Sequence, residues 1–505
     1  MPRVLLVETC TTPRPPADEL GAEHRVRHAL ALESVVEGRA DGARGVRRDV
    51  RGGELALFGI PLGAAFLAPG LRARGIEVLH EPLALHAAAR RDPLVALGDA
   101  VQRERPDVVG ITINHAVEEA TGLKMARLAK AVLPGVRVVL GGLHATFRAE
   151  VLAGEAAVDA VVRFEGEESL PRCVDWLTGR GEPDDVPGLV AQGPDGLRVV
   201  PAGPHVDFTR ARPDYDAVRA DEYCRAGVLA HVQTSRGCPY ECHFCCHTTF
   251  WGRKVRERDA GLVAEEVAEL LGRGCDLVYL TDSTFTLNRH RVEELCDAIE
   301  AHGAERATFA VETRIDRLDD RLLARMARAG VRIVALGVET VSPEVLDRLP
   351  DKRVADPLGA VRDAVRRIRA HGMSSYASLV LGLPGETSDS LRALVDAVDL
   401  LYADTDGLLW ADAKLARAFP GSAFADDPAR LHATVDARYE WYDFYGRVTV
   451  HVDGGPAEDE ILAARTAVME RNVRAWRRRR PGDEERVRDA VAKWRGGGPG
   501  APPGS

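Results

Sequence analysis

Short apolar runs alternate with amphipathic segments through the first third of the chain. The apolar runs predict five strands, at residues 3–8, 76–80, 108–114, 136–142 and 157–162. Residues 61–74 and 117–133 have helical spacing, and another helix is expected around 24–36, inside a long loop over 11–55. Strands that are apolar at nearly every position are typical of parallel sheets covered on both faces. The pattern predicts an N-terminal doubly wound, Rossmann-like α/β sheet.

A second alternation follows after residue 226. It predicts six strands, at residues 227–234, 277–282, 307–312, 332–339, 374–384 and 408–415. A helical segment precedes each of the last five strands. Six β/α units of this kind predict an incomplete parallel barrel, a partial (β/α)6 barrel, whose functional groups lie at the carboxyl ends of its strands.

Changes in composition divide the chain into five parts. We expect an N-terminal sheet domain over 1–180, a linker over 181–225, the partial barrel over 226–425, a small helical C-terminal region over 426–495 and a disordered tail over 496–505. The linker is rich in Pro, Gly and Asp, which are turn-forming residues. Five aromatic residues within 439–445 indicate either core packing or one wall of a substrate pocket.

Composition excludes some classes of function. The chain has 505 residues, 45% of them hydrophobic, and a net charge of −10, which argues against a nucleic-acid partner held by a broad basic surface. No signal peptide and no apolar stretch of membrane-spanning length is visible, so no membrane partner is expected. The nine cysteines are odd in number and lack disulfide-like spacing, which predicts a reducing, cytoplasmic location.

The clearest candidate metal-binding motif lies in residues 234–247. Cys238, Cys242 and Cys245 stand at C-x3-C-x2-C spacing. Soft thiolates select zinc or iron–sulfur clusters, and a cubane cluster needs one ligand for each iron, so three cysteines leave one iron open. Two alternatives are a zinc knuckle, with Cys246 or His247 as its fourth ligand, and a set of buried structural thiols.

This stretch, with Phe244 before the third cysteine, resembles the cluster motif of the radical S-adenosylmethionine (radical SAM) superfamily. The resemblance implies a 4Fe-4S cluster whose open iron is chelated by SAM, and cleavage of SAM to methionine and a 5′-deoxyadenosyl radical. Strand-end elements at Asp282, Arg314 and Glu339 resemble SAM-contacting positions of that family, as does Phe244. Each of the charged three is also open to a structural interpretation, as a salt bridge closing the top of the barrel.

The N-terminal sheet carries a second resemblance. A strand followed by Gly-Gly-Leu-His-Ala-Thr at 141–146, a helix, a further strand and Phe-Glu-Gly-Glu at 164–167 is similar to the cobalamin-binding domain that precedes many radical SAM domains. The resemblance covers roughly residues 1–180 and implies cobalamin contacts at Thr112, Asn114, Gly141, Gly142, His144, Thr146, Glu165 and Gly166. The Asp-x-His-x-x-Gly sequence that supplies a cobalt ligand in many such domains is absent, and His144 is equally compatible with a loop or capping role. A purely structural sheet is the alternative.

The two resemblances together imply a cobalamin-dependent radical SAM C-methyltransferase. The reaction would methylate an unactivated carbon of a small-molecule natural product through a 5′-deoxyadenosyl radical and methylcobalamin. An electron donor such as flavodoxin or ferredoxin would be its partner. The same cofactors also suit cyclisation, ring contraction or rearrangement without methyl transfer, and a non-enzymatic sensor is disfavoured by the complete set of barrel-end elements. A methylthiotransferase is set aside, because its N-terminal domain would be expected to carry more cysteines than Cys10 and Cys173.

Overall fold

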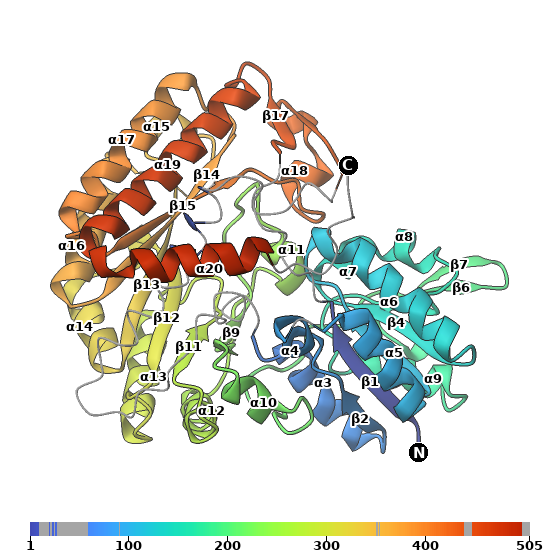
Figure 1. The fold of residues 1–505 in the computed structure, drawn as a ribbon. Coiled ribbons are helices and arrows are strands. Elements are labelled where there is room, and N and C mark those ends of the chain that lie inside the picture. Colours follow the sequence, from blue (N-terminus) through green and yellow to red (C-terminus); the bar gives the residue numbers. More distant parts are fainter. Residues whose placement is uncertain are drawn as a thin grey trace.

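The computed structural model describes residues 1–9, 20, 23, 24, 26, 27, 59–89, 91–349, 352, 354–438 and 447–496. Two α/β units lie side by side, and α7 of the first unit lies beside α11 of the second (Figure 1). Only residues 24, 26 and 27 of the predicted helix around 24–36 are described, and the aromatic cluster at 439–445 and most of the expected tail fall outside the described residues.

The first unit is built on a seven-stranded sheet in the order β2-β1-β3-β4-β5-β6-β7. Its strands are β1 Arg3–Glu8, β2 Glu77–His80, β3 Val108–Thr112, β4 Arg137–Gly141, β5 Ala160–Val162, β6 Leu189–Gly193 and β7 Gly196–Val199. Its helices are α3 Leu62–Ala73, α4 Leu83–Ala88, α5 Pro93–Glu104, α6 Glu119–Val132, α7 Leu143–Phe147, α8 Ala149–Ala153 and α9 Ser169–Leu177. The first five strands are parallel, which confirms the predicted sheet. The order 2-1-3-4-5 reverses direction between β1 and β3, where doubly wound sheets bind ligands.

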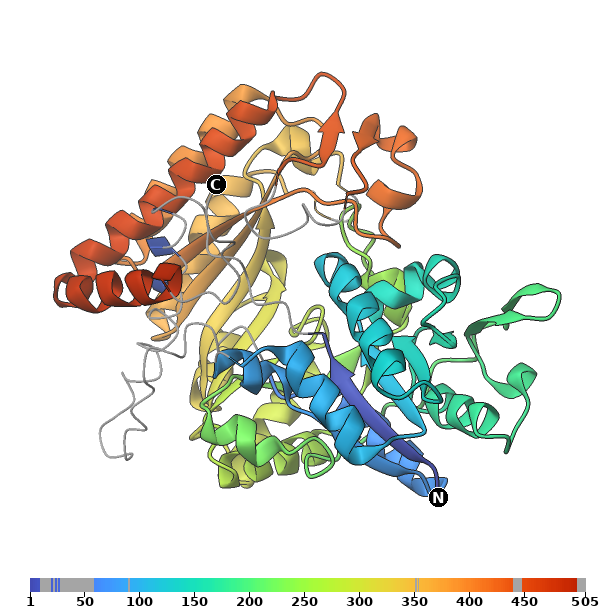
Figure 2. The ribbon, with the colours of Figure 1, turned by 45° about the vertical axis from the view of Figure 1, so that its right-hand side comes forward.

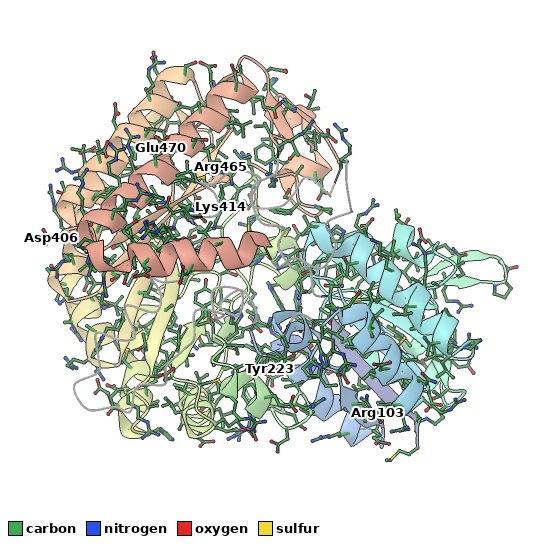
Figure 3. All side chains as sticks on the ribbon, in the orientation of Figure 1. Arg103, Tyr223, Asp406, Lys414, Arg465 and Glu470 are labelled. Atoms are coloured by element: carbon green, nitrogen blue, oxygen red, sulfur yellow. A yellow bond between two sulfur atoms is a disulfide. The ribbon has the colours of Figure 1, made fainter. Side chains whose placement is uncertain are left out.

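Part of the expected linker belongs to this sheet. Strands β6 and β7 form an antiparallel hairpin, and β6 pairs antiparallel with β5 through Val161–Val190 and Val162–Leu189. The buried residues Leu189, Val190 and Ala191 explain the pairing, because this short apolar run needs a covered face. The remainder of the segment holds α10 Ala220–Arg225, whose Tyr223 lies near the first unit (Figure 3) and bonds His80.

The second unit is an open sheet of six parallel strands in the order β15-β14-β13-β12-β11-β8. Its strands are β8 Ala230–Val232, β11 Leu277–Leu280, β12 Thr308–Arg314, β13 Val331–Glu339, β14 Ser374–Leu381 and β15 Leu409–Leu415. Its helices are α11 His247–Trp251, α12 Ala260–Gly272, α13 Arg289–Ala301, α14 Asp320–Arg328, α15 Pro343–Leu346, α16 Pro357–Ala370 and α17 Ser388–Asp404. Among the described residues β8 and β15 do not pair with each other, so the predicted partial barrel is confirmed.

The two faces of this sheet differ in character. Val311, Leu336 and Leu379 are buried in the main core and share the face that the helices cover. On the opposite, concave face, Glu312 and Tyr376 are only half-buried. Parallel sheets normally bury both faces, so a polar, half-exposed face is a place for something other than the chain's own core.

The C-terminal region closes one edge of the sheet. It comprises α18 Ala423–Asp426, β16 Ala433–Val435, β17 Val450–Val452, α19 Glu458–Arg479 and α20 Glu484–Gly496. Helix α19 runs along β15 (Figure 2) and places Asn472 against the unpaired strand edge. The Asn472 amide accepts from Ala411 N at 3.2 Å and donates to Ala411 O at 2.6 Å. It thus replaces the neighbouring strand that an edge residue lacks.

Two further findings bear on the sequence-based expectations. Cys224 in α10 and Cys275, just before β11, form a disulfide with a Cα–Cα distance of 5.0 Å. This pairing corrects the interpretation that the cysteines lack disulfide-like spacing, and their 51-residue separation gave no sign of it in the sequence. Among the described residues, no helix combines the length and the apolar character needed to cross a bilayer.

Candidate active site at the junction of the two sheets

The three motif cysteines lie in one loop between β9 (Ser235–Arg236) and α11. Backbone hydrogen bonds close this loop, because Cys238 N donates to Gly252 O at 3.1 Å and Cys245 N donates to Cys242 O at 3.0 Å. Gly237, which enters the loop, has φ +101°, and a Cβ there would collide with Lys254 O. Only glycine fits this position, so the backbone presents the cysteines in a fixed arrangement.

Asp282, at the end of β11, anchors the start of the cluster loop. Its carboxylate accepts from Thr234 N at 3.0 Å, from Ser235 Oγ at 2.9 Å, and from Thr234 Oγ1 and Ser235 N. Three of these hydrogen bonds reach Oδ1 and one reaches Oδ2. These hydrogen bonds give Asp282 a positioning role two to three residues before Gly237, and its contact with SAM stays a prediction.

The thiols lie in a poorly solvated environment. Burial raises the pKa of Cys242 to about 11 and that of Cys245 to about 12. Burial also raises the pKa of the neighbouring Cys246 to about 11. In the part of the chain that is described, no three His, Cys, Asp or Glu side chains are placed to hold a single ion. A cubane cluster distributes its thiolates over separate irons, so the three soft donors fit it better.

A pair of opposite charges lies beside Cys242. Glu339, at the end of β13, accepts from Lys352 Nζ at 2.7 Å, and Lys352 also donates to Gly337 O at 3.1 Å. The backbone of Glu339 has φ +63°, a left-handed conformation that is rare for a non-glycine residue and is found often at functional sites. A Cβ on Gly337 would lie 2.9 Å from Glu339 Oε1, so the Gly-Val-Glu element needs its glycine to make room for this pair.

Arg314 supplies a second cation. Its guanidinium forms hydrogen bonds of 2.9 and 3.0 Å with Asp316 and lies 4.1 Å from the ring centre of Tyr240 in the cluster loop. The charges of Lys352 and Arg314 act to lower the pKa of Cys242, and that of Glu339 acts to raise it, although burial dominates. Carboxylate and cationic groups near Cys242 suit a zwitterion, and the amino and carboxylate groups of SAM form one.

Phe244, which was predicted, and Lys352, which was not, complete this side of the site. Phe244 is half-buried and packs against the apolar cluster around Leu383 and Phe424, so its side chain supports the loop. Lys352 was not found from the sequence, because it lies outside any regular element and belongs to no motif. Its position beside Glu339 is visible only in the folded chain.

The predicted cobalamin residues fall into two groups. Thr112, Gly141 and Gly142 are half-buried and Asn114 is exposed, all at the carboxyl ends of β3 and β4, next to the β1–β3 reversal. Gly142 has φ +100°, and a Cβ there would lie 2.8 Å from Asn114 Oδ1 and from Ile113 O. The glycine therefore lets the start of α7 pack closely against the end of β3.

The other four predicted cobalamin residues are engaged within the protein. His144 is buried and its Nε2 lies 2.7 Å from Glu119 Oε2, which is an internal ion-pair contact. Thr146 Oγ1 donates to Gly142 O at 2.9 Å and accepts from Phe164 N at 2.8 Å.

Glu165 and Gly166 complete this second group. The Glu165 carboxylate accepts from two arginines of the second unit, and a Cβ on Gly166 would lie 2.9 Å from Leu67. Both residues thus have contacts within the protein, and their contact with cobalamin stays a prediction.

The carboxyl edge of the first sheet meets the cluster loop. Phe147 of α7 and Phe164 after β5 lie 6.4 and 6.0 Å, between ring centres, from Phe250 of α11. Thr249 Oγ1 also donates to Gly421 O at 2.7 Å, which ties α11 to the segment after β15. A cofactor on the edge at Gly141–Gly142 would therefore face the cluster loop across a short, aromatic-lined contact.

Comparisons with known proteins agree with this arrangement. Residues 232–398 match the model of the radical SAM superfamily, and residues 48–174 match that of the B12 binding domain. The "uncharacterized methyltransferase PH0819" of Pyrococcus horikoshii is 29% identical over 370 residues, which is 72% of this chain and 77% of that protein. The anaerobic magnesium-protoporphyrin IX monomethyl ester cyclase of Rubrivivax gelatinosus is 29% identical over 355 residues, 68% of this chain and 62% of that protein.

A solved structure shows the same fold over nearly the whole chain. The radical SAM methyltransferase TsrM of Kitasatospora setae, with cobalamin and a [4Fe-4S] cluster bound, superimposes with a TM-score of 0.68 and 20% identity. The superposition covers 96% of this chain and 90% of TsrM. With a B12-binding domain at residues 48–174 joined to a radical SAM domain at residues 232–398, the chain is a cobalamin-dependent radical SAM enzyme that uses a 4Fe-4S cluster, SAM and cobalamin.

Proposed function

We propose that this enzyme is a C-methyltransferase that acts on an unactivated carbon of a small-molecule substrate. The observation that carries the proposal is a contact between the two domains. The carboxyl edge of the B12-binding sheet lies against α11, the helix that directly follows the cysteine loop. The relative that matches over the larger share of both chains is also named a methyltransferase. When bound, the cluster and SAM supply a 5′-deoxyadenosyl radical, and cobalamin supplies the methyl group.

The residues fit separate tasks in this proposal. Cys238, Cys242 and Cys245 would hold the cluster, with Phe244 packing behind their loop. Glu339, Lys352 and Arg314 would hold the amino and carboxylate groups of SAM at the open iron. The cobalamin would rest on the edge formed by Thr112, Asn114, Gly141 and Gly142.

The concave face of the barrel would bind the substrate. Tyr279 donates to Glu312 at 2.8 Å, and Tyr376 donates to Asp412 at 2.6 Å. Lys414, labelled in Figure 3, follows on β15 and donates to Ser378 at 3.2 Å. Hydrogen-bonding groups of both charge signs favour a polar small molecule over a hydrocarbon, because a hydrocarbon would displace the water that solvates their remaining donor and acceptor positions.

Cyclisation or rearrangement without methyl transfer is the second candidate. It is favoured by the cyclase among the relatives, which shares 29% identity but matches over a smaller part of its own length. The same cofactors serve both reactions, so the products decide between them. For either reaction we propose a cytoplasmic enzyme that receives electrons from a flavodoxin or ferredoxin.

The products formed from SAM test the proposal. Protein reconstituted anaerobically with iron, sulfide and cobalamin is given SAM, a strong reductant and polar candidate substrates. S-adenosylhomocysteine, 5′-deoxyadenosine and substrate mass are then measured together. We expect comparable amounts of both nucleoside products and a substrate heavier by one methylene unit. A transformed substrate without methyl gain, with 5′-deoxyadenosine alone, would establish the second candidate instead.

Variants of the cysteines supply the matched controls. Cys242→Ala should lose the cluster's iron and both products, because a cubane held by two cysteines lacks a required ligand. Cys246→Ala, next to the motif and buried, should keep iron content and products. Loss of the cluster in Cys246→Ala with retention in Cys242→Ala would contradict the ligand assignment.

A further inference from the structure

Arg236 joins the cluster loop to the other unit. It lies in β9, two residues before Cys238, and only 4% of it is exposed. Its Nη1 donates to Glu165 Oε1 at 2.6 Å, and its Nη2 lies 2.7 Å from Glu167 Oε1. Both glutamates follow β5 of the B12-binding sheet. One guanidinium thus holds two carboxylates from the sheet edge that faces the cluster loop.

The Arg236 guanidinium is also fixed by aromatic side chains. Its central carbon lies 4.0 Å from the ring centre of Phe208, 4.7 Å from Trp251 and 5.2 Å from Phe66. Stacking on these rings sets the plane of the guanidinium, and its fork geometry then sets where the two carboxylates lie. A lysine could supply the charge here but not this planar arrangement.

Groups of the chain occupy all four acceptor positions of the Glu165 carboxylate. Its Oε1 accepts from Arg236 and, at 2.8 Å, from Arg256 Nη1, and its Oε2 contacts His205 Nδ1 at 2.8 Å and Val206 N at 3.2 Å. Burial acts to raise the pKa of this carboxyl, but hydrogen bonds and charges of Arg256 and Arg236 outweigh it and leave the pKa lowered. With all four acceptor positions used, the carboxylate has one arrangement rather than several.

We propose that Arg236, Glu165 and Glu167 form a positioning unit that sets the cluster loop at a fixed place relative to the cobalamin edge. This inference rests on the proposed function, because only a reaction that uses both cofactors needs that spacing. A displacement of about 1 Å between reacting groups costs on the order of a hundredfold in rate. Weakening the unit therefore uncouples the two reactions of SAM. Cleavage of SAM at the cluster continues, and transfer of its methyl group to cobalamin slows.

The test measures two products in the same sample. Fully reconstituted wild type and the variants Arg236→Lys, Glu165→Gln and Glu167→Gln receive SAM and a strong reductant without added substrate. Initial formation of S-adenosylhomocysteine reports transfer of the methyl group from SAM to cobalamin. Formation of 5′-deoxyadenosine reports cleavage of SAM at the cluster. Glu167→Gln is the mildest change, because that side chain is half-buried, and it keeps the test available if the other two variants do not fold.

Two spectroscopic measurements separate positioning from general damage. The electron paramagnetic resonance spectrum of the reduced cluster, with and without SAM, reports whether cluster and SAM site are intact. Absorbance titration with hydroxocobalamin reports the cofactor's affinity. Glu266→Gln is the matched control, because Glu266 is a buried carboxylate that lies 2.6 Å from Arg258 and accepts from Tyr215 at 2.7 Å without contacting the cluster loop.

We expect Arg236→Lys and Glu165→Gln to lower the rate of S-adenosylhomocysteine formation at least about tenfold, with 5′-deoxyadenosine formation within about twofold of wild type. Their spectra and cobalamin affinity should match those of Glu266→Gln. An unchanged ratio of the two products in all three variants of the unit would overturn the inference, and so would an equal loss in Glu266→Gln. Wild type that carries cluster and cobalamin but releases no S-adenosylhomocysteine would instead refute the proposed function, and the inference with it.

Discussion

Replacing Asp282 with alanine should loosen the start of the cluster loop. Thr234 is fully buried and Ser235 is half-buried, and the backbone N–H groups of both donate to this carboxylate. A buried donor that loses its acceptor costs about 1–3 kcal/mol, so two such donors cost about 2–6 kcal/mol. The two hydroxyl donors can turn toward other acceptors and add less. The perturbation is therefore local and its magnitude is set by two amide groups.

Hydrogen–deuterium exchange measures this cost directly. Since about 1.4 kcal/mol corresponds to a factor of ten, the exchange of the Thr234 and Ser235 amides should accelerate at least about thirtyfold in metal-free Asp282→Ala. Asp282→Asn keeps one carbonyl oxygen for both amides and should show a smaller effect. After reconstitution, Asp282→Ala should also hold less iron, because Cys238 lies only three residues after Ser235.

Asp412→Ala provides the control for general destabilisation. Asp412 is a second buried carboxylate of the same sheet, on β15 at its far edge, and its partner is Tyr376. Exchange at Thr234 and Ser235 should not change in this variant. Equal protection of these amides in wild type and Asp282→Ala would refute the reasoning, because it would mean that the four hydrogen bonds do not restrain the loop.

Three further predictions address stability and the SAM site. Asn472→Ala leaves the N–H and C=O groups of Ala411 unpaired and should lower the unfolding free energy by about 2–5 kcal/mol. The loss is measured as a lower midpoint of urea unfolding. An unchanged midpoint would show that water replaces the amide at this edge. The buried His80 has a pKa lowered by burial to about 4, against an ordinary 6.5. The unfolded chain thus binds more protons between these values, and stability should fall by about 3 kcal/mol as pH drops through that window. Thermal unfolding of His80→Gln should depend less on pH there, and identical profiles for the two proteins would contradict this. Glu339→Gln should weaken SAM binding about 10- to 100-fold by removing a charge-assisted contact, with iron content unchanged; full SAM affinity in equilibrium dialysis would exclude Glu339 from the SAM site.

Much of the architecture was predictable because it depends on local patterns. Runs such as 108–112 and 137–141 are apolar at nearly every position, and a parallel strand buried on both faces leaves that signature in any sequence. The cysteine spacing was equally visible, since the motif occupies one short loop. The hairpin β6–β7 was missed because its segment is rich in turn-forming residues and only Leu189, Val190 and Ala191 are buried.

The site was predictable as a set of positions but not as a set of roles. Asp282 and Glu165 are at the strand ends where cofactor contacts were expected, and both carboxylates also accept four hydrogen bonds from the chain itself. Which groups a carboxylate meets depends on residues 48 and 71 positions away, and no periodicity encodes such partners.

The sequence by itself determined the order of strands and helices, the cluster loop and the class of cofactors, because each depends on neighbouring residues. Tertiary structure alone decided that Lys352 lies beside Glu339, that Cys224 meets Cys275, and that Asn472 completes the edge of β15. These contacts join segments brought together by packing of the whole core. Their energies depend on burial and on hydrogen-bond saturation, which exist only once the chain has folded.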